Sequence, residues 1–312
     1  MSFGISSILT EVLARSAGVE ITSPVHIRAV GGGSINNAYH ITTSQGQQWF
    51  CKINDAGRFP DLFVLERQGL DLLEAAGVIR VPKIIACDVI AGRQILVLEW
   101  IGEGLRSNDF WKTFGSQLAR LHQGSNKYFG LSHSNYMGAL PQSNTPSPDW
   151  VEFFRDQRLF PQVKLAVDKG LMGATEVHHF ERLYKVLNTI FEKEPPALLH
   201  GDLWSGNFLC DDKGQPVLID PAVYFGHRSM DLAMTTLFGG FERPFYEAYA
   251  WHYPFPPNHR EQWDVCNLYP LLIHLNLFGK GPSSGGPFSP SSPITFEGLG
   301  YLRNILHTIQ CF

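Results

Sequence analysis

The sequence predicts an α+β protein of two lobes, the first rich in β-strands and the second mainly helical. Between residues 25 and 99, short apolar runs alternate with turn residues, as is typical of antiparallel strands. From about residue 102 onward, apolar residues recur instead at helical spacing. The chain has 312 residues, of which 44% are hydrophobic and 17% charged, so it is long and apolar enough to form two packed cores.

The first lobe is expected at residues 1–101. It opens with an amphipathic helix, because Ile8, Leu9, Val12 and Leu13 recur at helical spacing. A second helix is expected at 60–76, where it ends at a glycine. The strands are expected at residues 25–30, 38–43, 48–53, 83–90 and 94–99.

The second lobe is expected at residues 102–312. Its predicted helices lie near residues 108–123, 149–169, 176–193, 229–238, 241–251 and 259–278. Three short extended pieces interrupt them at 197–199, 207–210 and 216–220, the last two joined by a turn at Lys213 and Gly214. Residues 280–298 are rich in Gly, Pro and Ser, which favours a flexible loop.

Composition excludes several classes of partner. The formal net charge of −4 argues against a nucleic-acid surface. No apolar run reaches the roughly 18 residues of a membrane span, and the N-terminus lacks the pattern of a signal peptide, so we expect a cytoplasmic protein. The five cysteines form no C-x-x-C pair, so neither a disulfide framework nor a zinc site is expected. Oligomeric state is left open.

The strongest motif is HGDLWSGN at residues 200–207, followed by LIDP at 218–221. Phosphoryl transfer needs a carboxylate that takes the proton of the attacking hydroxyl, and oxygen ligands that hold Mg²⁺ at the phosphates of ATP. Asp202 suits the first task, and Asn207 with Asp220 suits the second. The same D-x-x-x-x-N with a downstream Asp occurs in protein kinases, so this assignment rests on that match. Each half alone could be an ordinary turn or strand end.

The first lobe contains the partners that a kinase site requires. Lys52 lies in a predicted strand and can neutralise phosphate charge, while Glu66 on the following helix can pair with it. The plain alternative is an exposed strand lysine and an exposed helix acid. Since apolar residues flank Lys52, however, a half-buried charge would need a partner.

Two further segments are expected to contact the nucleotide. The turn at residues 31–41 (GGGSINNAYHI) follows a strand, and its backbone N–H groups can approach phosphates. The residues expected there are Gly32, Gly33, Ser34 and Asn36. LVLEWI at 96–101 ends the lobe, and the backbone groups of Glu99 and Ile101 can bind the adenine edge. Alone, either segment could be a simple hairpin or connection.

HGDLWSGN, the run IDPAVYFGHRSMDLAM from residue 219 and HLNLFG at 274–279 resemble the fructosamine kinase (ketosamine-3-kinase) family, from about residue 5 to 279. The resemblance implies a bilobal, protein-kinase-like fold that uses ATP and Mg²⁺. It also implies phosphorylation of the sugar 3-hydroxyl of a ketosamine, free or on a glycated protein amine, which makes the adduct labile. Trp204 then becomes a candidate for stacking on the sugar, with core packing as its alternative.

Several residues have other expected roles. His200 is expected to brace the catalytic loop by hydrogen bonding, Asp231 to cap or brace the same loop, and Cys51 to pack away from the phosphates. This family usually has Glu where the chain has Ser229, so acceptor affinity or specificity could differ. Two alternatives stay open, a kinase of the same fold acting on an aminoglycoside, choline or homoserine, and an inactive binding scaffold.

Overall fold

The computed structural model describes residues 4–16, 25–31, 36–279 and 300–312. Contacts between residues divide the chain into two compact units. The first unit comprises residues 1–114 and 208–221, and the second comprises 115–207 and 222–312. The sequence predicted an ATP-binding lobe at 1–101 and a catalytic lobe at 102–312. That division assigns functions and not contacts, and it stays a prediction. The predicted flexible stretch at 280–298 lies outside the described residues.

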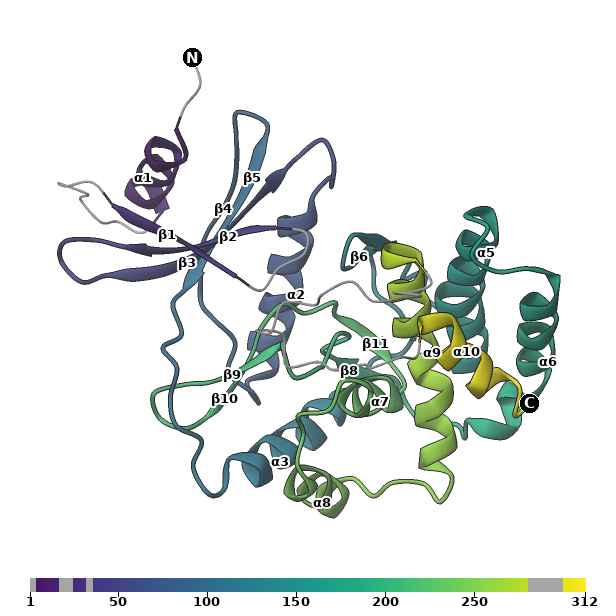
Figure 1. Ribbon diagram of the computed structural model, residues 1–312. Coiled ribbons are helices and arrows are strands. Elements are labelled where there is room, and N and C mark those ends of the chain that lie inside the picture. Colours follow the sequence, from purple (N-terminus) through teal and green to yellow (C-terminus); the bar gives the residue numbers. More distant parts are fainter. Residues whose placement is uncertain (1–3, 17–24, 32–35, 280–299) are drawn as a thin grey trace. The chain divides into compact units, whose positions relative to one another are not determined.

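A five-stranded antiparallel sheet forms the centre of the first unit, in the order β1-β2-β3-β5-β4 (Figure 1). Its strands are β1 (His26–Val30), β2 (Asn37–Thr42), β3 (Gln48–Asp55), β4 (Ile84–Ile90) and β5 (Arg93–Glu99). Two helices accompany it, α1 (Ile5–Ser16) and α2 (Leu62–Ala76). All lie within a few residues of the predicted ranges, because the alternation of apolar residues and the turn residues between strands are local signals.

The two faces of this sheet have different neighbours. Successive strand residues point to opposite faces, so Cys51 and its cross-strand neighbour Val97 share one face, and Lys52 and its neighbour Leu96 share the other. The Cys51 face packs against α1 in a buried apolar cluster that includes Leu9. As predicted, Cys51 is therefore a packing residue, and burial raises the pKa of its thiol. Lys52 is left on the opposite face.

The first unit also contains the hairpin of β9 (Phe208–Cys210) and β10 (Pro216–Leu218). Helix α3 (Phe110–His122) begins in this unit and ends in the second. The Phe208 ring lies 5.1 Å from that of Phe114 and 6.1 Å from that of Phe110, so aromatic packing joins the hairpin to the start of α3. This packing sets the position of the segment that leads to Asp220.

The second unit is mainly helical, as predicted. Its helices are α4 (Trp150–Phe153), the π-helical turn η1 (Phe154–Leu159), α5 (Phe160–Asp168), α6 (Ala174–Ile190), α7 (Ser229–Leu237), α8 (Arg243–His252), α9 (His259–Phe278) and α10 (Tyr301–Ile309). Its short strands pair as β6 (Asn135–Met137) with β7 (Leu140–Gln142), and β8 (Ala197–Leu199) with β11 (Tyr224–Gly226). Helix α9 is mostly buried and contacts α5, α7 and α10.

The predicted helix at 149–169 contains a π-helical turn, which the sequence analysis did not anticipate. Pro161 has no N–H to donate to the Gln157 carbonyl four residues earlier, so the α-helical ladder is interrupted there. That carbonyl accepts instead from Arg158 Nη1 at 3.1 Å. Arg158 is fully buried and its second amino group donates to Asn144 Oδ1 at 2.7 Å, which stabilises the wider turn. Over the ranges that the structure describes, no helix has the length and apolar character needed to cross a membrane.

Candidate active site

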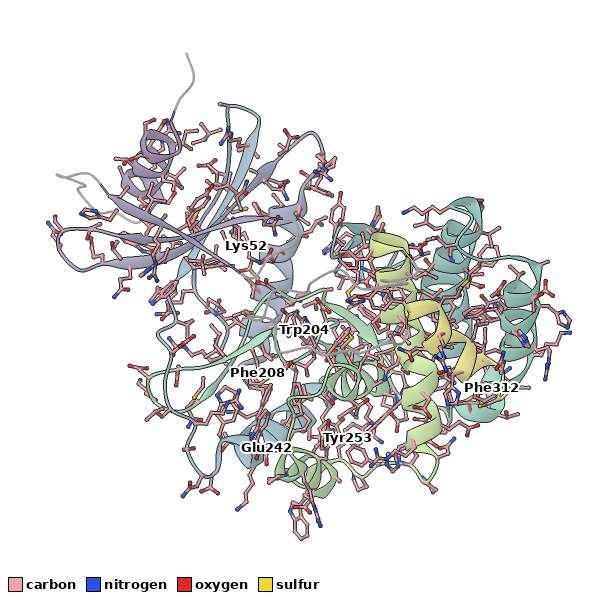
Figure 2. All side chains as sticks on the ribbon, viewed as in Figure 1. Lys52, Trp204, Phe208, Glu242, Tyr253 and Phe312 are labelled. Atoms are coloured by element: carbon pink, nitrogen blue, oxygen red, sulfur yellow. The ribbon has the colours of Figure 1, made fainter. Side chains whose placement is uncertain are left out.

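Lys52, labelled in Figure 2, lies in β3. Two carboxylates of the first unit hold its side chain. Its Nζ donates to Glu66 Oε1 at 2.7 Å and to Asp220 Oδ1 at 2.6 Å, and the residue is only 4% exposed. Burial by itself lowers the pKa of Lys52, but attraction to Asp220 and Glu66 outweighs burial, and the pKa is raised. The lysine therefore stays charged at neutral pH. The pairing expected from the order strand, Lys, helix, Glu is present.

Asp220 adopts an unusual backbone conformation just after β10. Its φ of 55° places it in the left-handed region, where among non-glycine residues Asp and Asn are the most tolerated. Such conformations persist where the surroundings hold them, and here Lys52 holds one carboxylate oxygen. Because the Asp220 side chain is 44% exposed, its carboxylate remains accessible to a cation.

The segment expected to bind adenine is anchored by a residue that the sequence analysis missed. Arg80 donates through Nη2 to Glu99 Oε1 at 2.6 Å and through Nη1 to Asp211 Oδ2 at 2.5 Å. Asp211 lies in the β9–β10 hairpin, and its other carboxylate oxygen accepts backbone N–H groups of the hairpin turn. Arg80 thus ties the Glu99 segment to the hairpin that leads to Asp220. The Glu99 backbone N–H donates to the Lys83 carbonyl oxygen at 2.9 Å, and contact of the Glu99 and Ile101 backbone with adenine stays a prediction.

The Gly-rich turn is only partly described. Gly32, Gly33 and Ser34 lie outside the described residues. Asn36 is described, and its Oδ1 accepts from Asn54 Nδ2 at 2.5 Å, so its side chain braces the start of β2. A direct role of Asn36 at the phosphates stays a prediction.

Asp202 and Asn207, both in the second unit, form a tight local pair. Asn207 Nδ2 donates to Asp202 Oδ2 and to the Asp202 backbone oxygen, each at 2.9 Å. The backbone oxygen can only accept, so the amide nitrogen of Asn207 must face it and Oδ1 must face away. Asn207 therefore steadies Asp202 and keeps a carbonyl oxygen of the kind that Mg²⁺ binds.

A buried aspartate, Asp231, holds the loop that carries Asp202. Asp231 accepts the backbone N–H of His200 at 2.7 Å and that of Gly201 at 2.9 Å, and it also contacts His122 Nε2 at 3.2 Å. Burial raises the pKa of Asp231, but the contact with His122 and the backbone hydrogen bonds outweigh it, and the pKa is lowered. Gly201 has a φ of +84°, and a Cβ there would lie 2.1 Å from the Ala222 oxygen, so only glycine fits. Asp231 braces the loop as expected.

His200 and Ser229 are both buried. The Nδ1 of His200 accepts the Asp202 N–H at 3.3 Å, which agrees with the expected bracing role. Ser229 is 2% exposed and donates to Gln262 Oε1 at 2.8 Å. Ser229 therefore takes part in the packing of α7 on α9, and an effect of this residue on acceptor affinity or specificity stays a prediction.

The structure brings the predicted residues together as two sets, one in each unit. Lys52, Glu66 and Asp220 form the first set, and Asp202 with Asn207 forms the second. The metal pair of Asn207 and Asp220 combines residues of both units, so it stays a prediction. Within the described part of the chain, no group of three or more His, Cys, Asp or Glu side chains forms a cluster that could hold a metal by itself.

Comparison with known proteins identifies the family. The fructosamine kinase family model matches residues 6–285. The chain is 41% identical over 274 residues to a Lactiplantibacillus plantarum protein named "Probable ketoamine kinase", covering 86% of this chain and 94% of that protein. It is 36% identical over 280 residues to the chloroplastic protein-ribulosamine 3-kinase of Arabidopsis thaliana, covering 86% and 82%.

A solved structure agrees with these relatives. The crystal structure of a Thermobifida fusca protein assigned as a fructosamine-3-kinase superposes with a TM-score of 0.83 at 31% identity, covering 98% of each chain. The predicted kinase-like α+β fold is thereby confirmed, and so is the resemblance found in the motifs. By its sequence and its fold, this chain is a phosphotransferase that belongs to the fructosamine kinase family.

Proposed function

We propose that this protein transfers the γ-phosphoryl group of ATP to the sugar 3-hydroxyl of a ketosamine. The acceptor would be a fructosyl or ribulosyl amine, either free or attached to a protein. Family membership supports the acceptor class. The observation that supports ATP as donor is the double pairing of Lys52 with Glu66 and Asp220, since a lysine fixed in this way can neutralise nucleotide phosphates.

In the proposed reaction, the carboxylate of Asp202 accepts the proton of the 3-hydroxyl. One of its oxygens accepts from Asn207 Nδ2 at 2.9 Å, which fixes the orientation of the carboxylate. The sugar oxygen forms a bond to the γ-phosphorus while the bond from that phosphorus to the bridging oxygen of ATP breaks, which releases ADP. Lys52 stabilises negative charge on the phosphates, and Asp231 keeps the loop of Asp202 in position.

The donor set fits Mg²⁺ as the accompanying metal. Asn207 Oδ1 and the exposed carboxylate of Asp220 are hard oxygen ligands, and a bound Mg²⁺ would offset charge on the phosphates. The proposal includes a cytoplasmic location.

An activity panel tests the proposal. ATP consumption should be measured with fructosyl-lysine, ribulosyl-lysine, an aminoglycoside, choline and homoserine, and phosphorus NMR should locate the phosphate on the product. We expect turnover of the ketosamines, with the phosphate on the 3-oxygen. Turnover of another acceptor in the absence of ketosamine turnover would refute the acceptor but leave the kinase chemistry standing.

Two variants test the roles of the residues. Asp202→Asn should lower kcat by roughly 10²–10⁴-fold and leave nucleotide binding nearly unchanged, because a base is lost. The exposed Asp212→Asn is a matched control and should behave as wild type. Asp220→Ala should remove the dependence of ATP affinity on Mg²⁺ in calorimetry. ATP affinity of the wild type that is equal with and without EDTA would argue against the metal site.

A further inference from the structure

A row of four aromatic side chains begins beside the catalytic loop. Trp204, whose backbone N–H donates to the backbone carbonyl oxygen of Asp202 at 3.2 Å, has its ring centroid 5.7 Å from that of Phe238. Phe238 lies 5.1 Å from His274, and His274 lies 5.3 Å from Tyr301. We call Trp204, Phe238, His274 and Tyr301 the aromatic row. All four belong to the second unit, in which Figure 2 labels Trp204.

The aromatic row differs from the aromatic core of the same unit. Core rings such as those of Phe180 and Phe245 are fully buried, whereas each member of the row is only partly buried. The row is nevertheless ordered, since its members come from four different segments that hold each other in place. Partly exposed rings with fixed positions are typical of binding sites, because little side-chain entropy is lost when a ligand arrives.

Trp204 is positioned by a glycine. A Cβ at Gly206 would lie 2.3 Å from Cη2 of the Trp204 ring, so the ring lies directly against the backbone of Gly206. Any larger residue at 206 would displace it. The SGN of HGDLWSGN therefore does more than space Asp202 from Asn207, because it also sets the orientation of Trp204.

His274 adds a hydrogen-bond acceptor to the row. Its Nδ1 lies 2.7 Å from the Pro270 carbonyl oxygen, which can only accept, so Nδ1 carries the proton. Burial lowers the pKa of His274 and keeps the ring neutral. Nε2 then carries the lone pair of the ring, and the hydrogen bond that the described residues give this ring is the one from Nδ1. A lone pair beside aromatic faces is suited to a protonated amine.

We propose that the aromatic row binds the protonated secondary amine of the ketosamine and the first carbons of the amine substituent, with His274 Nε2 accepting an ammonium N–H. This inference rests on the proposed function. In a ketosamine the amine is on C1, close along the sugar chain to C3, so a 3-hydroxyl at Asp202 brings the amine towards the nearest member of the row, Trp204. Recognition through π faces and a neutral imidazole also explains how a cation can be selected without an excess of acidic residues.

The test compares an amine with a neutral analogue. Steady-state kinetics should be measured with a fructosyl amine and with a fructose ether in which oxygen replaces the amine at C1. Phe238→Leu and His274→Phe should each raise KM for the amine about tenfold, the effect of roughly 1.4 kcal/mol, while kcat and KM for ATP stay unchanged. KM for the ether should change by less than twofold. Trp251→Leu, which removes an 85% exposed ring outside the row, is the matched control and should change neither.

A second measurement uses the wild type alone, so folding of the variants does not limit the test. A 3-deoxy ketosamine, which cannot be phosphorylated, should inhibit about tenfold more strongly than its ether counterpart. Equal inhibition, or a variant that raises KM for amine and ether by the same factor, would overturn the aromatic row as the amine site while ketosamine turnover still supports the proposed function. If the wild type turns over no ketosamine, both proposals fail together.

Discussion

The brace at Asp231 makes a prediction that can be worked through from the hydrogen bonds. Asp231 is 1% exposed and accepts from the backbone of His200 and Gly201, with His122 as a third contact. In Asp231→Asn the side chain keeps its shape but has one oxygen, so its NH₂ group must face a donor. One charge-assisted hydrogen bond is lost, at about 1.5–3 kcal/mol, and one buried donor is left unsatisfied, at about 1–3 kcal/mol. The free energy of unfolding should therefore fall by about 3–5 kcal/mol.

Two assays measure the effect. At about 2–4 °C per kcal/mol for a domain of this size, Tm should fall by roughly 10 °C. Since Asp202 follows the two anchored residues directly, we also expect kcat to drop by about 10²-fold at a temperature where the variant is folded. Asp212→Asn serves again as the control. A Tm within about 2 °C of wild type together with unchanged kcat would refute the brace.

Three further predictions concern stability and nucleotide binding. Burial lowers the pKa of His227 to about 4, so on acidification the unfolded chain takes up this proton before the folded chain does. The free energy of unfolding should therefore fall by roughly 3 kcal/mol as pH drops from about 6.5 to about 4. His227→Gln should remove this loss. Arg228→Ala should cost about 3–5 kcal/mol in urea denaturation, because Arg228 is 3% exposed and donates to Glu194 at 2.7 and 2.9 Å. Arg80→Ala should raise KM for ATP about fivefold with kcat unchanged, because its partly exposed contact with Glu99 is worth about 1 kcal/mol.

Controls separate these effects from general damage. Arg243→Ala removes the exposed pair with Glu247 and should change stability by no more than about 0.5 kcal/mol. If Arg228→Ala is equally mild, the buried pair contributes no more than a surface pair. An unchanged slope of stability against pH in His227→Gln would assign the acid sensitivity to other groups. For Arg80, the conservative Arg80→Lys should partly restore KM, and a variant that lowers kcat instead would contradict the anchoring role.

Signals that are local along the chain were sufficient for much of the fold and part of the site. The strands of the sheet and the long helices follow from apolar periodicity and turn residues, which act over a few neighbours. The pair of Asp202 and Asn207 is five residues apart in one loop, so its motif alone predicts the contact. Lys52 and Glu66 are fourteen apart on consecutive elements, which made their pairing predictable from the order of strand and helix.

Other features depend on contacts between distant parts of the chain, and no local pattern encodes them. Arg80 and Asp211 are 131 residues apart, and His122 and Asp231 are 109 apart, yet these pairs anchor the two segments that the nucleotide and the acceptor are proposed to use. The three-residue strand β11 is too short for any period to be visible in the sequence. Ser229 is a further case. Its difference from the family pattern suggested altered recognition of the acceptor, whereas the structure shows it buried and bonded to Gln262.

The sequence by itself therefore indicated the family and the fold class of this protein, and it named the residues that we propose for phosphoryl transfer, because short motifs hold those groups at fixed spacing. Only the tertiary structure decided what keeps them in place and what lies beside them. Packing brings together distant residues in three places. These are the contact of Asp231 with the loop of Asp202, the contact of Arg80 with Glu99, and the aromatic row that begins at Trp204. Such contacts form only when distant segments pack together, and that packing is a property of the folded chain and not of any stretch of its sequence.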